Sequence, residues 1–521
     1  MARWIPVPEA STLGVDESVT IIVNGTDVAL CRDANGYYAL SNRCPHRRGQ
    51  IGDGRVANGR AWCPLHNWDF DLRTGISPYN PTDRLETYPV AVNGSGVEID
   101  ADAVPVTPAT GYLRDYQGRY RRFVDDVESE YDAVQHFARV GEGAVEAMRT
   151  TRPVVGFDAV QFRPAQLATL PVLDDEPITL GVTLGAKCNH PLTLSMPVLV
   201  SHMSFGALSK EAKIALARAS ADAGIAICSG EGGMLPEERD NASQYILEMA
   251  SGYFGWTEEN IRRADAIEIK IGQAAKAGAG GLLPGSKVTP EIAKVRGLEA
   301  GQTAHSPAHF PDIANSRDLA EWVAEIRRMT DGRPVGIKIA ASHVEEDLEQ
   351  ALESQPDWIT LDGRPGGTGA APVHLKDHVG IPTIYAVDRA RRFFDRYRVR
   401  DTDLIVTGGL RTPADFAKAI AMGADAVAIA TSAMMAIGCQ QYRACHTGNC
   451  PVGIATQRSD LRDRFDIDTA TTMAGNYFAV VRDQLADYCR VLGKRDIHTL
   501  SVEDLVTTDS EISNHTAVEH A

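Results

Sequence analysis

LIVTGGLRTPADFAKAIAMGADAVAIAT, residues 404–431, contains one complete strand-helix-strand unit of the predicted fold. The run from Leu404 to Thr407 is short and apolar, which is typical of a buried strand. An amphipathic helix is predicted from Pro413 to Met422, and Ala426 to Ile429 has the pattern of a second buried strand. Buried strands that alternate with amphipathic helices favour an α/β fold.

The same alternation extends upstream over much of the chain. Five further buried strands are predicted, at residues 198–201, 225–228, 266–270, 335–339 and 358–361. Helices are predicted between strands, for example at 210–223 and 344–354. Seven clear strands in this arrangement predict a (β/α)8 barrel, also called a TIM barrel. We take the weaker segment 382–387 as the eighth strand.

The N-terminal region has a different character from the barrel. Residues 1–105 contain short strand-like runs separated by turn pairs such as Asn24-Gly25, which predicts an all-β domain. The other predicted segments are a linker and helical segment at 106–169, with a helix from Glu142 to Arg149, the barrel at 170–505 and a flexible tail at 506–521. The predicted fold is therefore multidomain, with an all-β domain followed by an α/β barrel.

The composition argues against several classes of function. The net charge is −17 and no long run of Lys and Arg occurs, which argues against nucleic-acid binding and against anionic membrane surfaces. The N-terminus carries no apolar signal core, and the longest mostly apolar run, 422–439, is interrupted by Asp425 and by glycine. We therefore expect a cytoplasmic protein without a membrane span. Nine cysteines in such a chain favour metal ligation over disulfides.

Two pairs of cysteine and histidine occur in the N-terminal region, Cys44-x-His46 and Cys63-x2-His66. A zinc knuckle is one interpretation, but zinc fingers usually group Cys with Cys and His with His. Here each pair is mixed and is flanked by predicted strands. The segment resembles the Rieske [2Fe-2S] fold, in which two Cys hold one iron and two His hold the other. The resemblance implies that these four residues bind a [2Fe-2S] cluster.

Three cysteines, Cys439, Cys445 and Cys450, follow the last predicted strand. They lie in CQQYRACHTGNCPVGIATQ, residues 439–457, which resembles the [3Fe-4S] loop in the synthase domain of glutamate synthases. The spacing and the trailing Cys-Pro-Val-Gly carry the resemblance, and buried structural cysteines are the alternative. It extends over about residues 150–500 and implies a barrel that binds FMN beside a three-iron cluster.

Small residues after two strands predict a phosphate site. Gly408 and Gly409 end one strand, and Ala430 and Thr431 end the next. Barrels commonly bind phosphate at the last two strands through backbone N–H groups and a helix N-terminus, so this pattern indicates FMN.

The resemblance adds further flavin-facing residues: Met203, Ser204, Gly230, Gly366, Gly367, Thr368 and Gly369. It places Lys338, within a buried strand, where its charge would stabilise the anionic reduced flavin.

The reaction that the resemblance implies is reductive amination. Ammonia condenses with 2-oxoglutarate to 2-iminoglutarate, which a hydride from FMN N5 reduces to L-glutamate. Lys276 and Arg296 would bind the two carboxylates with the assistance of Gln273, because Arg suits bidentate carboxylate capture. An ordinary helix surface is the alternative for Arg296. Glu231, flanked by glycines, is the candidate for proton transfer, with a turn residue as its alternative.

Two positions depart from the family pattern. Residue 2 is Ala, where a glutaminase domain needs an N-terminal Cys, so we expect a separate glutaminase or ligase subunit to supply nitrogen. Ala279 stands where the family usually has Glu, and a smaller residue there would leave room for an alkylamine.

The leading hypothesis is a glutamate synthase-like oxidoreductase. Electrons would pass from a redox partner through the Rieske centre to the three-iron cluster and FMN. The product would be L-glutamate or an N-substituted glutamate, and we expect a homo-oligomer. Three alternatives remain: a glutamate or N-alkylglutamate dehydrogenase that exports electrons, N-methylglutamate synthase, and a non-catalytic electron-transfer subunit.

Overall fold

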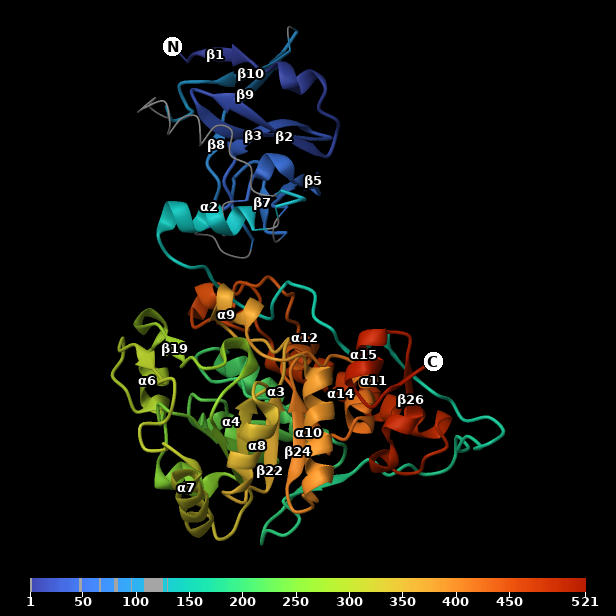
Figure 1. Ribbon diagram of the computed structural model, residues 1–521. Helices are drawn as coiled ribbons and strands as arrows, with labels where there is room; N and C mark the ends of the chain where they lie inside the picture. The colour runs from blue at the N-terminus through green and yellow to red at the C-terminus, as the bar shows by residue number, and fades with distance from the viewer. Residues whose placement is uncertain are drawn as a thin grey trace. The chain divides into compact units, whose positions relative to one another are not determined.

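The computed structural model describes residues 2–45, 49–64, 67–78, 83–94, 96–106, 125–128 and 130–521. The chain divides into two compact units, Met1–Glu142 and Gly143–Ala521 (Figure 1). The second unit therefore begins upstream of the predicted residue 170. The reason is that strand β12 (Val160–Phe162) pairs with strand β26 (Leu505–Thr507) near the C-terminus, which ties this segment to the barrel.

The described residues of the N-terminal unit form three antiparallel sheets, with strand orders β2-β3-β4-β8, β1-β10-β9 and β5-β6-β7. The strands are β1 Trp4–Pro6, β2 Glu17–Val23, β3 Thr26–Asp33, β4 Gly36–Ser41, β5 Arg55–Ala57, β6 Arg60–Trp62, β7 Asp69–Asp71, β8 Thr87–Tyr88, β9 Val90–Asn93 and β10 Gly96–Asp100. Asn24 and Gly25 both have positive φ, as the tight turn between β2 and β3 requires. The predicted all-β domain is confirmed.

Helix α2 (Tyr131–Val140) also belongs to this unit. The helix predicted at 142–149 is wrong, because Gly141 ends α2 in the left-handed conformation, with φ 74°. Residues Val145–Glu146 instead form strand β11, which pairs with β23 (Ala371–Pro372) of the barrel unit.

The second unit is a closed barrel of eight parallel strands in the order β15-β16-β17-β18-β21-β22-β24-β25. The strands are β15 Val198–Val200, β16 Ala226–Cys228, β17 Gln244–Met249, β18 Ala266–Lys270, β21 Val335–Ala340, β22 Trp358–Asp362, β24 Asp403–Thr407 and β25 Ala426–Ile429. Pairing of β15 with β25 closes the ring, with Val198 opposite Val427. The predicted TIM barrel is confirmed, and the carboxyl ends of the parallel strands meet at one mouth.

Helices surround this barrel, as Figure 1 shows. They are α3 Lys210–Asp222, α4 Pro236–Asn241, α5 Glu258–Arg263, α6 Pro290–Arg296, α7 Ser316–Met329, α8 Val344–Leu352, α9 Val373–His378, α10 Thr383–Tyr397, α11 Pro413–Ala421, α12 Thr431–Ala436, α13 Ser459–Arg462, α14 Ile467–Val491 and α15 Ser510–His515. Short strands outside the barrel are β13 Val182–Leu184, β14 Leu192–Leu194, β19 Leu282–Leu283, β20 Ala304–His305 and β27 Glu519–His520.

The eighth strand is not the predicted segment 382–387. That segment is the start of α10, whose residues Ile384, Val387 and Ala390 are buried at helical spacing. The strand that the sequence did not predict is β17. A buried glutamate interrupts its apolar run, so β17 lacks the continuous apolar pattern of the other barrel strands.

The flexible tail predicted at 506–521 is also wrong. These residues complete β26 and form α15 and β27, and Ile512 and Val518 are buried within the core of the barrel unit. The apolar contacts of these two buried side chains hold the C-terminal residues against the barrel unit.

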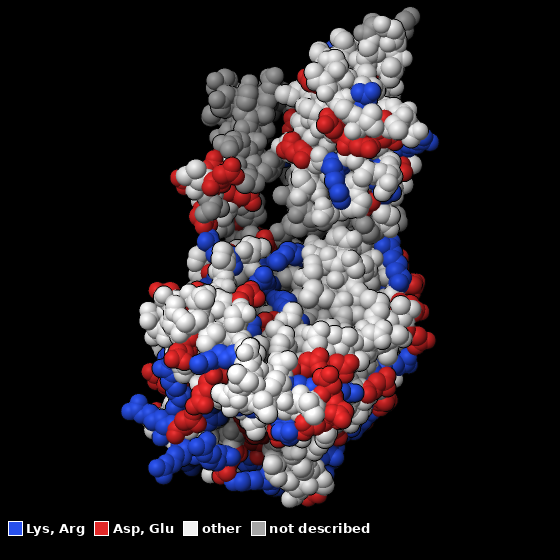
Figure 2. Space-filling view, turned by 90° about the vertical axis from the view of Figure 1, so that its right-hand side faces the viewer, with Lys and Arg blue, Asp and Glu red and all other residues white. Residues whose placement is uncertain are grey.

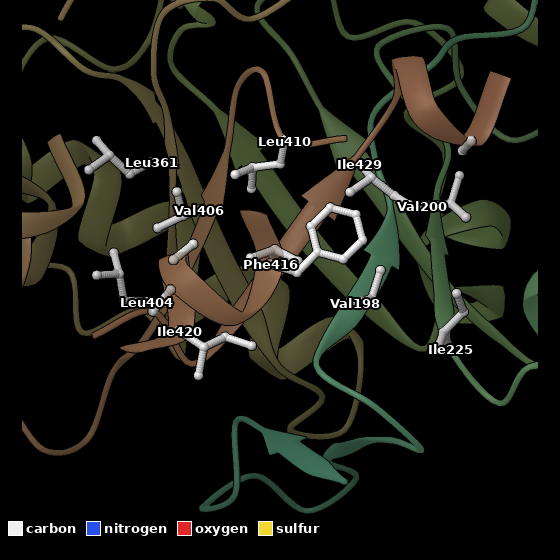
Figure 3. Packing of buried hydrophobic residues seen from close by; sticks show 14 of the residues in the cluster. Val198, Val200, Ile225, Leu361, Leu404, Val406, Leu410, Phe416, Ile420 and Ile429 are labelled. Carbon is white, nitrogen blue, oxygen red and sulfur yellow. The ribbon is translucent and has the colours of Figure 1, made fainter. Parts of the chain in front are cut away.

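The quoted stretch 404–431 packs as its pattern predicts. Figure 3 shows the ring of Phe416 of α11 lying between Val198 and Ile429 of the barrel strands, and Val406 belongs to the same core. Thr412 and Asp415 form a capping box at the start of α11, and Pro413 occupies its first turn. The helix therefore has a fixed start and a fully buried apolar face.

Charged side chains are interspersed over the outside of the molecule. On the face that Figure 2 shows, Lys and Arg are mixed with Asp and Glu over most of the described surface, with one group of Lys and Arg at the lower left. No helix in the described part of the chain is both long enough and apolar enough to span a bilayer.

Truncation of a core residue of the quoted stretch should destabilise the barrel. Leu404→Ala removes a fully buried side chain, and we expect the free energy of unfolding to fall by about 2–5 kcal/mol. Leu167→Ala is the matched control, because Leu167 is 92% exposed. Chemical denaturation measures both, and equal stabilities of the two variants would contradict the packing described.

Candidate active site

A buried carboxylate, Glu268 in the middle of β18, ties together three segments in the barrel interior. Its Oε2 accepts hydrogen bonds from Trp358 Nε1 at 2.9 Å and from Thr360 Oγ1, and its Oε1 pairs with His202 Nε2. Burial alone would raise the pKa of Glu268, but the charge and hydrogen bond of His202 outweigh it and lower the pKa to about 2. Glu268 is therefore an ionised, fully partnered anchor.

Glu231, the predicted proton-transfer residue, lies in a cluster of cations at this mouth. Lys270 Nζ donates to Glu231 Oε2 at 2.7 Å and to Glu248 Oε1 at 3.4 Å. Burial raises the pKa of Glu231, but Lys270, Lys276 and Arg296 together lower it to about 2. A carboxyl group with this pKa carries no proton near neutral pH, so the geometry favours an electrostatic role over proton transfer.

Arg296 is buried and not on an ordinary helix surface. It ends α6, is 4% exposed, and its Nη2 donates to the Phe205 carbonyl at 3.0 Å. Its guanidinium carbon lies 5.1 Å from the centre of the Phe254 ring. Among the described residues, Arg296 Nε has no hydrogen-bond partner, although it is buried. A buried unpaired N–H of this kind fits an anionic ligand.

Lys276, the last residue of the 3-10 helix Ala274–Lys276, lies close enough to Glu231 for its charge to lower the pKa of that carboxyl group. Burial lowers the pKa of Lys276, whereas the charge of Glu231 raises it. Gln273 directly precedes this helix, and its carbonyl accepts from Lys276 N at 3.3 Å. We name residues 273–296 the substrate segment, because it holds three of the predicted substrate-binding residues.

The predicted flavin loops pack against each other at the mouth. A Cβ on Gly230 would lie 2.5 Å from Ser204 N and 2.8 Å from the carbonyl carbon of Met203, so only glycine permits this contact. A Cβ on Gly408 would lie 2.0 Å from Gly363 O, and its φ is +109°.

The loop Gly366–Gly369 is more open. A Cβ on Gly367 would lie 3.5 Å from Thr431 Oγ1, and a Cβ on Gly369 would meet only Ala207 Cβ at 3.7 Å. A Cβ on Gly366, in contrast, would press on Asp362 Oδ1 at 2.7 Å. Gly367 and Gly369 thus leave the open space beside exposed backbone that a flavin requires.

The remaining predicted cofactor residues lie beside these loops. Lys338 on β21 is 3% exposed, with Nζ 3.8 Å from Asp362 Oδ2. Gly409 has φ +89°, Thr368 accepts a hydrogen bond from Met148 N at 2.7 Å, and Ala430 directly precedes α12.

Three arginines near the predicted phosphate site were missed from the sequence. Burial lowers the pKa of Arg411, and the nearby charges of Arg149 and Arg443 lower it further. Arg443 Nη1 donates to the Arg149 carbonyl at 3.0 Å. Guanidinium groups crowded in this way fit a phosphate. Arg411 directly follows Gly408-Gly409-Leu410, so the predicted phosphate loop could have indicated it. No sequence pattern around Arg149 indicates a phosphate ligand.

The three C-terminal cysteines come together in what we name the cysteine loop, residues 439–457. Burial raises the pKa of Cys445 to about 12, and the neighbouring Cys450 and Cys439 add to the shift. Cys439 and Cys450 thus lie close enough to Cys445 to change its ionisation, and three cysteines in one loop are a donor set that suits an iron-sulfur cluster.

Cys44 and Cys63 of the N-terminal unit are both 1% exposed. Cys44 N donates to Gly49 O at 2.9 Å, and Cys63 N donates to Trp68 O at 2.8 Å. His46 and His66 lie outside the described residues. The two thiols thus have the buried loop positions that the Rieske ligand pattern requires.

The comparison with protein families agrees with these sites. The model for the conserved region in glutamate synthase matches residues 155–495, and the model for the Rieske [2Fe-2S] domain matches residues 3–89. The chain belongs to the glutamate synthase family. Its N-terminal unit is a Rieske [2Fe-2S] domain, and membership of the glutamate synthase family, a family of oxidoreductases, implies FMN and a [3Fe-4S] cluster.

Several relatives share the glutamate synthase region. The archaeal glutamate synthase (NADPH) of Methanocaldococcus jannaschii is 41% identical over 322 residues, which cover 61% of this chain and 63% of that protein. The archaeal-type glutamate synthase (NADPH) of Thermotoga maritima is 38% identical, covering 64% and 66%. The glutamate synthase large subunit-like protein of Rhizobium meliloti is 34% identical over 398 residues, covering 73% and 90%.

The chain thus spans slightly less than two thirds of these two NADPH relatives. Among solved structures, an oxidized active mutant of (S)-mandelate dehydrogenase matches 67% of this chain and 88% of its own, at 14% identity and a TM-score of 0.45. That likeness is too low to bear on function.

Removal of one thiol should abolish one iron cluster of this glutamate synthase-family chain and leave the other intact. We expect Cys450→Ser to lose the three-iron electron paramagnetic resonance signal and to keep the Rieske signal, because Cys450 belongs to the cysteine loop alone. Cys188→Ser, which changes a half-buried cysteine outside both sites, should keep both signals. A three-iron signal that persists in Cys450→Ser would contradict this ligand assignment.

Proposed function

We propose that this chain reduces 2-iminoglutarate, formed from 2-oxoglutarate and ammonia or an amine, to L-glutamate or an N-substituted glutamate. Condensation releases water, and reduction adds a hydride to the imine carbon and a proton to the imine nitrogen. Bound FMN would supply the hydride, with electrons received from a redox partner through the two iron clusters. The nitrogen would come from a separate glutaminase or ligase subunit.

One observation carries the proposal: two cations, Lys276 and the buried Arg296 with its unpartnered Nε, both lie close enough to Glu231 to lower its pKa. Two cations at one site suit a dicarboxylate. A Cβ on Gly232 would lie 3.1 Å from Arg296 Nη2 and 3.0 Å from Ser204 Cβ, so this guanidinium adjoins the predicted flavin loops. Substrate carboxylates held there would place the imine carbon near the flavin.

The charges around the substrate have distinct roles. Arg296 and Lys276 would bind and orient the carboxylates, with Gln273 assisting. Glu231 stays ionised, and its charge opposes the lowering of the Lys276 pKa by burial, so it favours the cationic form of this lysine. Lys338 is buried on β21, and we infer that it faces the flavin, where its charge would stabilise negative charge on the reduced ring.

The second candidate product is an N-substituted glutamate, which the small side chain of Ala279 favours. Its N–H donates to Lys276 O at 3.0 Å, so it lies in the turn that presents Lys276. A methyl group at this position leaves more room and less negative charge than the Glu usual in the family. An alkylamine would therefore be accepted beside ammonia.

Reoxidation of the reduced flavin tests the proposed reaction. When enzyme reduced anaerobically receives 2-oxoglutarate and ammonium or methylammonium, we expect oxidised flavin absorbance to return. Arg296→Lys should raise the 2-oxoglutarate concentration needed for half-maximal rate by about 10–100-fold, through loss of about 1.5–3 kcal/mol of charged hydrogen bonding. Arg262→Lys, at an exposed arginine paired with Glu258, is the control.

Two other outcomes would contradict this direction of reaction. Bleaching of oxidised flavin by glutamate or an N-alkylglutamate, with no reoxidation by the oxoacid and amine, would indicate a dehydrogenase that exports electrons. No change with any of these compounds would indicate an electron-transfer subunit.

Loss of Glu231 should change the pH dependence of substrate binding. Because Glu231 raises the pKa of Lys276, Glu231→Gln should lower it, and binding of 2-oxoglutarate should weaken at a lower pH than in the unmodified enzyme. Titration of the dissociation constant between about pH 7 and about pH 10 measures this. Glu237→Gln, at a carboxylate paired with Lys210, should leave the profile unchanged, and identical profiles for all three proteins would refute the role of Glu231.

A further inference from the structure

Lys287 lies in the middle of the substrate segment, but its side chain contacts a different part of the chain. It ends the 3-10 helix Gly285–Lys287, after Lys276 and before α6, which carries Arg296. The short helix is fixed by its own backbone, since Lys287 N donates to Pro284 O at 2.9 Å. The position of Lys287 is therefore set by the segment that would bind substrate.

The side chain of Lys287 reaches the cysteine loop. Its Nζ donates to the carbonyl oxygen of Cys445 at 3.2 Å and to that of His446 at 2.5 Å. The methylene stem passes over Gly448, where an added Cβ would lie 3.1 Å from Lys287 Cε. Gly448 has φ +76°, which favours glycine, and ends the turn Cys445–Thr447, so the stem packs closely against this turn.

Among the described residues, no carboxylate forms a salt bridge with Lys287, although its side chain is half-buried. A partly buried ammonium without an acidic partner is unfavourable, and an anionic cluster of thiolates and sulfides would supply the missing charge.

We propose that Lys287 is a positioning residue for the three-iron cluster, which fixes the cysteine loop to the substrate segment and raises the reduction potential of the cluster. A positive charge beside the cluster stabilises its reduced form, which carries one more negative charge. The two carbonyl contacts hold the Cys445 ligand in place. This role is independent of the amine and of the direction of the overall reaction.

A potentiometric titration of the three-iron signal by electron paramagnetic resonance tests the proposal. Lys287→Met keeps the stem and removes the charge, and we expect the ratio of reduced to oxidised cluster at a fixed potential to fall about tenfold, equivalent to about 59 mV. Lys287→Arg keeps the charge and should restore most of the difference. The Rieske signal of each variant is the internal reference.

Lys418→Met is the matched control, because Lys418 is also a buried lysine that donates to a backbone carbonyl, that of Phe157 at 3.0 Å. It should leave the cluster potential unchanged. Failure of Lys287→Met to assemble the cluster, with assembly in Lys287→Arg and retained FMN and Rieske centre, would also support positioning. An unshifted potential in Lys287→Met, or equal shifts in Lys287→Arg or Lys418→Met, would overturn the proposal.

Discussion

The interior of the barrel depends on the buried carboxylate of Glu268. Taking an ionised carboxylate out of water costs several kcal/mol unless it is fully paired, and Glu268 is paired with His202, Trp358 and Thr360. These partners come from the segment after β15 and from β22, so one side chain on β18 fixes strands from different sides of the ring. The flavin loops and the substrate segment are built on strand ends that this network holds.

Positive charge inside this acidic protein is concentrated where anions would bind. The net charge is −17, yet Arg149, Arg411 and Arg443 crowd together near the predicted phosphate site. Lys276 and Arg296 form a second pair at the substrate segment. Lys276, Arg296, Arg411 and Arg443 are partly or wholly shielded from solvent, which strengthens their interaction with a bound anion, whereas Arg149 is exposed. The positions of these cations therefore indicate anionic ligands, although the net charge of the whole chain is negative.

The sequence predicted the features that rest on local pattern. Seven barrel strands are short apolar runs, and the cysteine sets have spacings that few other structures share. Strand β17 was not predicted from the sequence, because Glu248, which is buried in the barrel interior, interrupts its apolar run. The burial of the C-terminal residues and the approach of Arg149 to Arg411 depend on contacts between segments far apart in the chain, which no local pattern encodes. The electrostatic state of Glu231 likewise required the positions of Lys270 and Lys276 in space.

The central claim is that this one chain holds a flavin and two iron clusters. The most direct measurement is the cofactor content of the purified protein, by release of flavin with acid and by electron paramagnetic resonance. We predict about one FMN per chain together with separate signals of a Rieske centre and a three-iron cluster. Protein that binds no flavin, or that holds zinc in place of iron when expressed with both metals available, would contradict the account.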